Sequence, residues 1–332
     1  MHRKLTRPLT ALLAAACMAC AEPNAAPVII AHRGAGGYLP EHTLEAKTLA
    51  HAQGADFLEQ DLVLSRDGEV IVLHDVYLDA VTDVAERFPG RQREDGRFYA
   101  LDFTLAELRQ LRAQERVLPG SRLPAFPQRF APRLRLFRLH TFAEEIEFIA
   151  GLNRTSGRAA GLCPEIKAPA WHRRQGHDLS RAVLEVLARH ASAFPSNRVM
   201  LQCFDTNEVR RLRRELNYPG RLLQLLTPEE ARRIEEPDLR GMAAVANGLG
   251  PPIAAVVRWN EEGRPTVAPL AGWARAAGLE VIPYTLRADA PPPGAPSETA
   301  VLEALFHQAG VGGVFTDFPD RAVRFRDRNK AP

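Results

Sequence analysis

Seven charged or titratable side chains stand at or near the ends of apolar segments in this sequence. They are His32, Arg33, Glu59, Asp61, His74, Glu165 and Lys167. Three carboxylates brought together would repel one another, and a hard divalent cation relieves that repulsion. Ligands that offer only oxygen suit Ca²⁺ or Mg²⁺ better than zinc. An arginine, a lysine and such an ion would together receive the oxygens of a phosphate group.

Two histidines close to such a receptor could deliver and remove protons near neutral pH. Cleavage of a phosphodiester needs a proton at its leaving oxygen, so this chemistry fits the set. Taken singly, a histidine at a strand end or a Glu-x-Asp pair on a strand is more often structural or solvent-facing. Charges on strands that are expected to be buried need partners or a ligand. The set therefore favours a functional site more strongly than any one of its members does.

The acids are spaced so that one strand would turn them to the same face. Glu59 and Asp61 alternate along an apolar run, and alternate residues of a strand share a face. A tight turn at Asp67-Gly68 would fold the following strand back, which brings His74 near the two acids. The pattern therefore predicts that one hairpin gathers three of the seven side chains.

Eight short apolar segments are predicted to be strands: 28–31, 57–64, 162–166, 199–204, 222–226, 242–246, 281–285 and 313–316. Helical segments alternate with them, which predicts a parallel sheet, and eight repeats can close that sheet into an α/β barrel of the (β/α)8, or TIM, class. Functional sites of such barrels form at the carboxyl ends of the strands. We therefore expect His32, Glu59 and Glu165, from the first three strands, to converge there.

Several of the predicted helices have clear start signals. A capping residue precedes an acid by three positions at Thr104 with Glu107, Thr141 with Glu144, Asp205 with Glu208, and Thr227 with Glu230. The first of these lies in a stretch from about residue 76 to residue 140 that is rich in Arg, Pro and aromatic residues and breaks the alternation. A connection of that length predicts an inserted subdomain, and insertions at this end of a barrel often shape substrate access.

The first 21 residues are predicted to be a secretory signal rather than part of the fold. Three basic residues form a positive start, an apolar run over residues 9–19 follows, and small residues offer a cleavage site. The remaining chain, residues 22–332, is predicted to be one secreted barrel domain. Lipid attachment at Cys17 or Cys20 is the less favoured alternative.

Charge and hydropathy argue against two classes of partner. Without its first 21 residues the chain contains 40 basic and 40 acidic residues, and it lacks the basic run typical of nucleic-acid binding. The same part of the chain has no apolar stretch of about 18 residues that would span a membrane. Cys163 and Cys203 lie in apolar runs, where buried free thiols are commoner than the one disulfide that they could form.

The chain resembles a known enzyme family across most of its length. The motifs that carry the resemblance are His32-Arg33-Gly34, Pro40-Glu41, Glu59-x-Asp61, His74-Asp75 and Pro164-Glu165-Ile166-Lys167. Together they are similar to the glycerophosphodiester phosphodiesterase family. The similarity is strongest to its periplasmic bacterial branch, which shares GYLPEHTL, GADFLEQDLV, VLHD, HTFAEEIEF, PEIKAP, LQCFD and FTDFPD with little change. The match spans about residues 28–324.

The resemblance implies a (β/α)8 barrel with an insertion after the second strand, in agreement with the strand pattern. It implies hydrolysis of a small molecule, a glycerophosphodiester such as glycerophosphocholine or glycerophosphoethanolamine, to sn-glycerol 3-phosphate and an alcohol. Ca²⁺ is the usual cofactor in this branch, and Mg²⁺ is the alternative. The branch also implies a periplasmic location.

The resemblance further implies roles for the set: His32 and His74 as general acid and base, Glu59, Asp61 and Glu165 as metal ligands, and Arg33 and Lys167 as phosphate contacts. Which histidine protonates the leaving alcohol stays open. His42 stands where much of the family has Asn, and we interpret it as a structural or supporting residue of the subgroup. Segment 226–242 is shorter than in relatives, which leaves the selectivity for the alcohol open.

Other features of the sequence allow more than one interpretation. Phe204, Tyr284 and Phe315 lie at later strand ends and either wall the glycerol site or pack within the barrel. The glycines of segment 34–37 are expected to let the backbone pass close to a ligand. Two other functions stay open: a binding protein that keeps the barrel and the metal without turnover, and a phosphodiesterase that acts on intact phospholipids.

Overall fold

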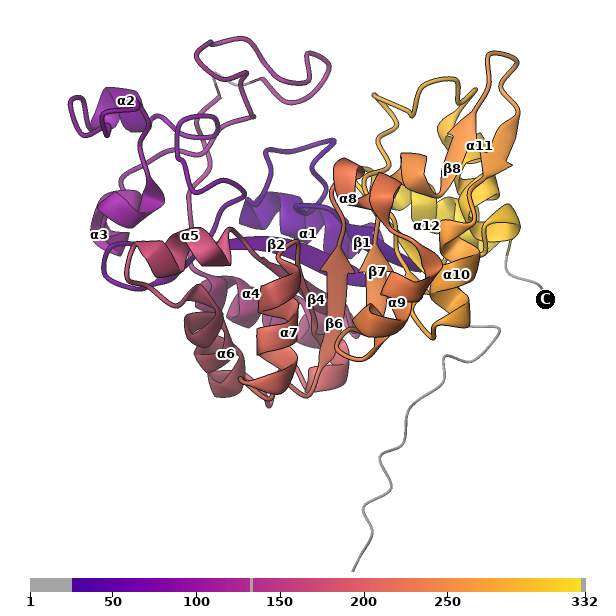
Figure 1. The fold of residues 1–332 in the computed structure, drawn as a ribbon. Helices are drawn as coiled ribbons and strands as arrows, with labels where there is room; N and C mark the ends of the chain where they lie inside the picture. The colour runs from indigo at the N-terminus through magenta and orange to yellow at the C-terminus, as the bar shows by residue number, and fades with distance from the viewer. Residues whose placement is uncertain (1–25, 132–133, 330–332) are drawn as a thin grey trace, which may run out of the picture.

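The structure is a computed structural model that describes residues 26–131 and 134–329 (Figure 1). The predicted signal segment, with Cys17 and Cys20, lies outside the described residues. No helix in the described ranges is long and apolar enough to cross a membrane. Cys163 and Cys203 are buried free thiols, as the sequence favours.

Within the described ranges, eight parallel strands form the barrel in the order β10-β7-β6-β5-β4-β2-β1-β11. They are β1 (Val28–Ala31), β2 (Phe57–Leu64), β4 (Gly161–Ile166), β5 (Met200–Cys203), β6 (Arg221–Leu225), β7 (Gly248–Gly250), β10 (Glu280–Val281) and β11 (Gly313–Thr316). The chain beyond β10 bonds to β11, where the Phe315 N–H donates to the Pro283 carbonyl at 3.0 Å. That contact closes the sheet on itself, which confirms the predicted (β/α)8 fold.

The prediction of a sixth strand over residues 242–246 is wrong. Helix α9 (Glu236–Ala243) covers the start of segment 242–246, and the strand that follows is β7, which pairs with β6. A Cβ atom at Gly248 would lie 2.8 Å from Leu223, and one at Gly250 would lie 2.4 Å from Leu225. Side chains of the neighbouring strand fill this space, so β7 needs glycines that carry no strand signal of their own.

Helices cover the outside of the barrel (Figure 1). They are α1 (Leu44–Ala52), α4 (Phe142–Ser156), α5 (Pro169–Arg174), α6 (Leu179–Arg189), α7 (Thr206–Arg214), α8 (Pro228–Arg233), α9, α10 (Leu270–Ala276), α11 (Glu298–Glu303) and α12 (Pro319–Arg328). The predicted helix starts are confirmed. Thr141 and Thr227 form complete capping boxes, and Asp205 accepts backbone N–H groups of the first turn of α7.

Segment 76–140 packs against the barrel through its own hydrophobic cluster. The segment contains α2 (Val84–Arg87) and α3 (Leu105–Leu108), which Thr104 caps as predicted, and Figure 1 shows both helices on one side of the barrel. The cluster includes Val63, Ile71, Leu73, Leu78, Phe98, Phe103 and Leu111. Since Ile71 belongs to β3 (Val70–Val72), the segment is anchored to the hairpin that precedes it. That the segment is an inserted subdomain stays a prediction.

A separate hairpin pairs β8 (Val257–Trp259) with β9 (Pro265–Val267).

Candidate active site

A cavity of about 420 Å³ opens at the carboxyl ends of the barrel strands. Its lining includes all seven side chains singled out in the sequence: His32, Arg33, Glu59, Asp61, His74, Glu165 and Lys167. They come from the ends of β1, β3 and β4 and from the middle of β2. Residues separated by up to 135 positions therefore meet in one place, as the parallel barrel requires.

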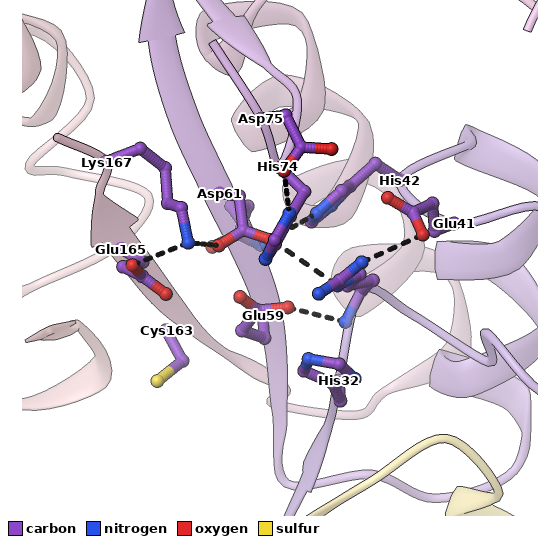
Figure 2. A network of polar contacts seen from close by, with 12 residues as sticks. His32, Glu41, His42, Glu59, Asp61, His74, Asp75, Cys163, Glu165 and Lys167 are labelled. Carbon is purple, nitrogen blue, oxygen red and sulfur yellow. Dashed lines mark hydrogen bonds and ion pairs between the residues drawn. The ribbon is translucent and has the colours of Figure 1, made fainter. Parts of the chain in front are cut away.

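Strand β2 presents its two acids to the cavity. Figure 2 shows Glu59 and Asp61 on one strand and Glu165 and Lys167 on its neighbour. Asp61 lies opposite Glu165 in the register of β2 and β4. Gln60, between the two acids, points the other way and donates to Glu145 at 2.9 Å. The alternation read from the sequence is thus confirmed.

The hairpin returns His74 to the acids as predicted. Strand β3 runs antiparallel to β2, and the Leu73 N–H donates to the Asp61 carbonyl at 2.8 Å. The His74 Nδ1 lies 2.7 Å from Asp75 Oδ1. Burial lowers the pKa of His74 to about 4, although Asp61 and Asp75 oppose the shift. The imidazole is therefore neutral at pH 7, with Nδ1–H donated to Asp75 and Nε2 left as an acceptor.

His32 has a matching arrangement at the end of β1. Its Nδ1 lies 2.6 Å from Asp317 Oδ1, and burial lowers the pKa of His32 to about 4 despite that carboxylate. His32 and the positively charged Arg287 and Arg129 overcome the effect of burial and hold the pKa of Asp317 well below its usual range. The sequence analysis did not select Asp317. Its signal was its place in FTDFPD, directly after the last strand and next to β1 in the closed barrel.

Arg33 is held in an unusual backbone conformation. Its φ is 57°, in the left-handed region, and its backbone N–H donates to Glu59 Oε2 at 2.5 Å. Its guanidinium donates to Glu41 Oε2 at 2.9 Å. Such a conformation costs about 1–3 kcal/mol for a residue other than glycine and persists only where its surroundings hold it. The contacts to Glu59 and Glu41 provide that restraint.

The glycines after Arg33 approach the protein's own atoms. A Cβ atom at Gly34 would lie 2.9 Å from the Ala46 backbone, and one at Gly37 would lie 2.4 Å from the Phe318 ring. The close approach that these glycines permit is therefore internal packing, and neither residue lines the cavity. That the backbone here also passes close to a ligand stays a prediction.

The three carboxylates lie close together and shift one another's pKa values. Burial, with Asp61 beside it, raises the pKa of Glu165 to about 8 even though Lys167 Nζ lies 2.8 Å from Glu165 Oε1. Burial and Asp61 likewise raise the pKa of Glu59 well above its usual range. Lys167, whose Nζ lies 3.5 Å from Asp61 Oδ1, overcomes burial and helps to hold the pKa of Asp61 low. The pKa values of the three carboxylates are thus pushed apart, that of Asp61 downward and those of Glu59 and Glu165 upward.

These residues fit a hard divalent cation. Asp61 Oδ1 is buried and receives no hydrogen bond. A cation at this place would satisfy that oxygen and favour the ionised forms of Glu59 and Glu165, because each carboxylate prefers its charged form next to positive charge. The donors are oxygens, which suit Ca²⁺ or Mg²⁺.

His42 lies beside the acids but faces them as a donor. An atom of His42 lies within 4.8 Å of oxygens of both Glu59 and Asp61, and His42 Nε2 is 2.7 Å from Asp61 Oδ2. The other ring nitrogen, Nδ1, lies 3.5 Å from the Lys47 ammonium, which has only donors. Nδ1 must therefore accept and Nε2 must carry the proton, which leaves no lone pair for a metal. The geometry supports a structural role for His42, which also has a positive φ of 58°.

The later strands supply an apolar wall. Phe204, Tyr284 and Phe315 all line the cavity, so they form its wall as well as packing in the barrel. The Tyr284 hydroxyl donates to the Leu226 carbonyl at 2.6 Å, and this bond fixes the orientation of the Tyr284 ring. The cavity lining also includes residues that sequence reasoning missed: Gln202, Ile253, Arg287 and the prolines of segment 291–293. Gln202 stands in the motif LQCFD on β5, which is a signal that could have found it. The context of the others carried no signal, because nothing local marks a loop that folds over a distant strand end.

Comparison with known proteins decides the family. Residues 32–321 match the sequence model described as the Glycerophosphoryl diester phosphodiesterase family. The chain belongs to this family. It is 41% identical to a glycerophosphodiester phosphodiesterase of Haemophilus influenzae, over 93% of this chain and 92% of the relative. It is 39% identical to one of Treponema pallidum, over 90% of this chain and 91% of the relative.

Solved structures agree on the barrel. A structure from Silicibacter pomeroyi that carries the name of the same family aligns with a TM-score of 0.70 at 25% identity, and the alignment covers 92% of this chain and 95% of the other. A phosphodiesterase of Oleispira antarctica, solved with its product sn-glycerol-3-phosphate, aligns with a TM-score of 0.60 at 23% identity, over 91% and 97% of the two chains. The family resemblance read from the motifs is confirmed, and hydrolysis of glycerophosphodiesters is the activity of this enzyme.

A buried ion pair supports the site of this phosphodiesterase from behind. Lys47 of α1 is fully buried, and its Nζ lies 3.0 Å from Glu145 of α4. The same ammonium donates to the Glu59 carbonyl. Glu145 also accepts from Gln60 and bonds to His140. Lys47 therefore joins the outer helices to the strand that carries two of the acids.

Replacing Lys47 by methionine is expected to lower the free energy of unfolding by about 3–5 kcal/mol, because Glu145 would remain as a buried charge without its ammonium. Denaturant unfolding followed by circular dichroism measures this change. The double variant Lys47→Met/Glu145→Gln should recover part of the loss. An unfolding midpoint in Lys47→Met equal to that of the wild type would contradict the expectation.

Proposed function

We propose that the protein hydrolyses glycerophosphodiesters such as glycerophosphocholine and glycerophosphoethanolamine to sn-glycerol 3-phosphate and an alcohol, with a divalent cation and two histidines. One observation carries the proposal. His32 and His74 each have Nδ1 at 2.6–2.7 Å from an aspartate, and both line the cavity that contains the three carboxylates and two cationic side chains. This arrangement combines proton transfer with phosphate binding.

Glu59, Asp61 and Glu165 are the proposed ligands of the cation. Asp61 Oδ1, which receives no hydrogen bond, and the raised pKa values of the other two acids support this assignment. The oxygen donors suit Ca²⁺ or Mg²⁺, and the resemblance to the family's bacterial branch makes Ca²⁺ the proposed ion. When bound, the ion supplies positive charge to the phosphate oxygens.

Arg33 and Lys167 are the proposed phosphate contacts. Both side chains are mostly buried at the cavity. Each already forms an ion pair with a carboxylate, Arg33 with Glu41 and Lys167 with Glu165. Those partners fix where the positive charges stand before substrate arrives. A phosphate in the cavity would therefore meet donors that need little rearrangement.

The histidines are proposed to carry the protons. One accepts at Nε2 a proton from the attacking water as the new P–O bond forms. The other donates a proton to the leaving alcohol as the old P–O bond breaks. Since burial holds both pKa values at about 4, the donor must gain its proton when the anionic phosphate binds, because negative charge nearby raises the pKa of a histidine.

The location is also a proposal. A signal in residues 1–21 would direct the chain to the periplasm, and the positive start with its apolar run supports this. The mass of the mature protein isolated from cells tests it: cleavage after residue 21 is expected. A mature N-terminus that begins at a lipid-modified Cys17 or Cys20 would replace it with an anchored form.

Release of sn-glycerol 3-phosphate from glycerophosphocholine, measured with and without a chelator, tests the proposed function. We expect release that stops on chelation and returns when Ca²⁺ is added. Parallel assays on a lysophospholipid and an intact phospholipid decide the substrate class. Metal-dependent binding of glycerophosphocholine with no product after long incubation would overturn the proposal in favour of a binding protein.

The stability of the metal-free protein is expected to fall as the pH rises from about 7 to 8. Folding raises the pKa of Glu165 from 4.5 to about 8, so in this window the folded state keeps a proton that the unfolded state has lost. The free energy of unfolding then decreases by up to about 1.4 kcal/mol per pH unit. The histidines, whose folded pKa values are lowered, act in the opposite sense only at lower pH.

Urea unfolding at pH 7 and pH 8 in a chelating buffer measures this slope. The matched variant is Glu165→Gln, which cannot titrate and should lose less stability between the two pH values. Equal pH slopes in the two proteins would show that Glu165 has given up its proton well below pH 7.

A further inference from the structure

Two arginines of segment 76–140 contact the carboxylates that hold side chains of the active-site cavity. They are Arg116 and Arg129, and their side chains are 18% and 6% exposed. Neither lines the cavity, so neither is placed to touch the substrate. Arginines so deeply covered need several acceptors, and each of these two has more than one.

Arg116 joins the carboxylates behind His74 and Arg33. Its Nη1 donates to Asp75 Oδ2 at 2.7 Å, and Asp75 Oδ1 is the oxygen that lies against His74. Its Nε and Nη2 donate to the two oxygens of Glu41 at 2.8 and 2.6 Å. Glu41 in turn accepts from Arg33. One guanidinium therefore fixes the partner of a proposed proton carrier and the partner of a proposed phosphate contact.

Arg129 makes the equivalent contacts behind His32. Its Nη2 donates to Asp317 Oδ2 at 2.6 Å, while Asp317 Oδ1 lies against His32. Its Nε donates to Asp289 at 2.8 Å and its Nη1 to the Gly36 carbonyl at 3.2 Å. Asp289 directly precedes segment 290–293, which lines the cavity. Arg129 therefore connects the histidine partner with the loop that walls the same cavity.

The two aspartates share one arrangement. In Asp75 and in Asp317, one oxygen meets a histidine Nδ1 and the other meets an arginine from segment 113–138. An aspartate held at both oxygens cannot rotate away, so the imidazole keeps its tautomer and its orientation. Asp317 has a second cation, Arg287, at 2.9 Å, whereas Asp75 has Arg116 as its cation.

We propose that Arg116 and Arg129 are positioning residues for the phosphodiesterase reaction, Arg116 acting on His74 through Asp75 and Arg129 acting on His32 through Asp317. The inference rests on the proposed function, which assigns proton transfer to the two histidines. Segment 76–140, which follows His74 and Asp75, thereby contributes to catalysis without supplying a catalytic residue. Its contribution is divided, one arginine to each histidine.

The variants Arg116→Met and Arg129→Met test the proposal in the full-length, metal-loaded enzyme. We expect kcat to fall by about 10- to 100-fold in both variants, because the orientation of one histidine is lost. KM should change by less than about 3-fold in Arg129→Met, where the substrate contacts remain. It should rise further in Arg116→Met, because Glu41, the partner of the phosphate contact Arg33, also loses its guanidinium. Arg116→Lys should recover part of the activity, since an ammonium can reach one carboxylate but cannot span two. The matched control is Arg122→Met, in the same segment, whose side chain is 92% exposed.

Nuclear magnetic resonance of histidine-labelled protein separates positioning from general destabilisation. The Nδ1–H signals of His32 and His74 report their bonds to Asp317 and Asp75. Arg116→Met should shift or broaden the His74 signal alone, and Arg129→Met the His32 signal alone. Should a methionine variant fail to fold, the same signals and kcat are read in Arg116→Lys and Arg129→Lys.

Three outcomes would contradict the proposed positioning role, each in a different way. Unchanged histidine signals together with an unchanged kcat would overturn the positioning role. Both signals moving equally in each variant, with a matching fall in melting temperature, would also overturn it and indicate a structural role. A selective signal shift with an unchanged kcat would overturn the assignment of proton transfer to that histidine, and the positioning role with it, while the contact itself would stand.

Discussion

Replacing His74 or His32 by alanine is expected to lower kcat/KM for glycerophosphocholine by about 10²- to 10⁴-fold, the usual contribution of a positioned general acid or base. An aspartate holds each imidazole at the cavity, through contacts of 2.6 and 2.7 Å. His42 could not take over the transfer, because its Nε2 is engaged with Asp61. Release of sn-glycerol 3-phosphate measures the effect.

A change of leaving group can tell the acid from the base. An ester of glycerol phosphate with p-nitrophenol releases a stable phenolate and needs no proton at that oxygen. The variant that lacks the general acid should therefore regain most of its activity on this ester, while the variant that lacks the base should not. His307→Ala is the control, since the His307 side chain is exposed and does not line the cavity. Undiminished turnover of glycerophosphocholine in both cavity variants would sink the assignment of the histidines.

Replacing Asp61 by asparagine is expected to lower kcat/KM by about 100-fold or more and to remove the stabilisation of the protein by Ca²⁺. Asp61 is the one acid of the three whose pKa is held low, so it offers full negative charge to a cation. Loss of a metal's several kcal/mol of charge stabilisation corresponds to at least this factor. Ca²⁺ at 100 times its Kd should stabilise the wild type by about 2.7 kcal/mol.

Melting curves with chelator and with added Ca²⁺, taken alongside the activity assay, measure both effects. The variant Glu262→Gln removes an exposed carboxylate that does not line the cavity and should behave as the wild type does. Full activity after exhaustive chelation would take Glu59, Asp61 and Glu165 out of their proposed role. A Ca²⁺-dependent rise in melting temperature that persists in Asp61→Asn would place the ion elsewhere.

Much of the site could be predicted from local patterns. The alternation of Glu59 and Asp61 needs only the two-residue period of a strand, and the return of His74 needs only the turn at Asp67-Gly68. The position of Glu165 at a strand end follows from the repeat of strands and helices. Such features depend on residues a few positions apart, so the chain shows them without its fold.

Other parts could not be predicted because they depend on contacts between distant segments. The carboxylate that holds His32 comes from Asp317, 285 positions away, and reaches it only because β1 and β11 are neighbours in the closed barrel. Strand β7 was missed for a related reason: its glycines are required by the leucines of β6, which nothing near β7 in the sequence reveals.

The sequence by itself determined the barrel, seven charged or titratable side chains of its cavity and the family of the chain, because each follows from short-range periodicity or from contiguous motifs. Only the tertiary structure decided how those side chains are held. The aspartate behind each histidine, the arginines from segment 113–138 and the buried ammonium of Lys47 are fixed by barrel closure and helix packing. These long-range contacts set charge and orientation, which no local pattern encodes.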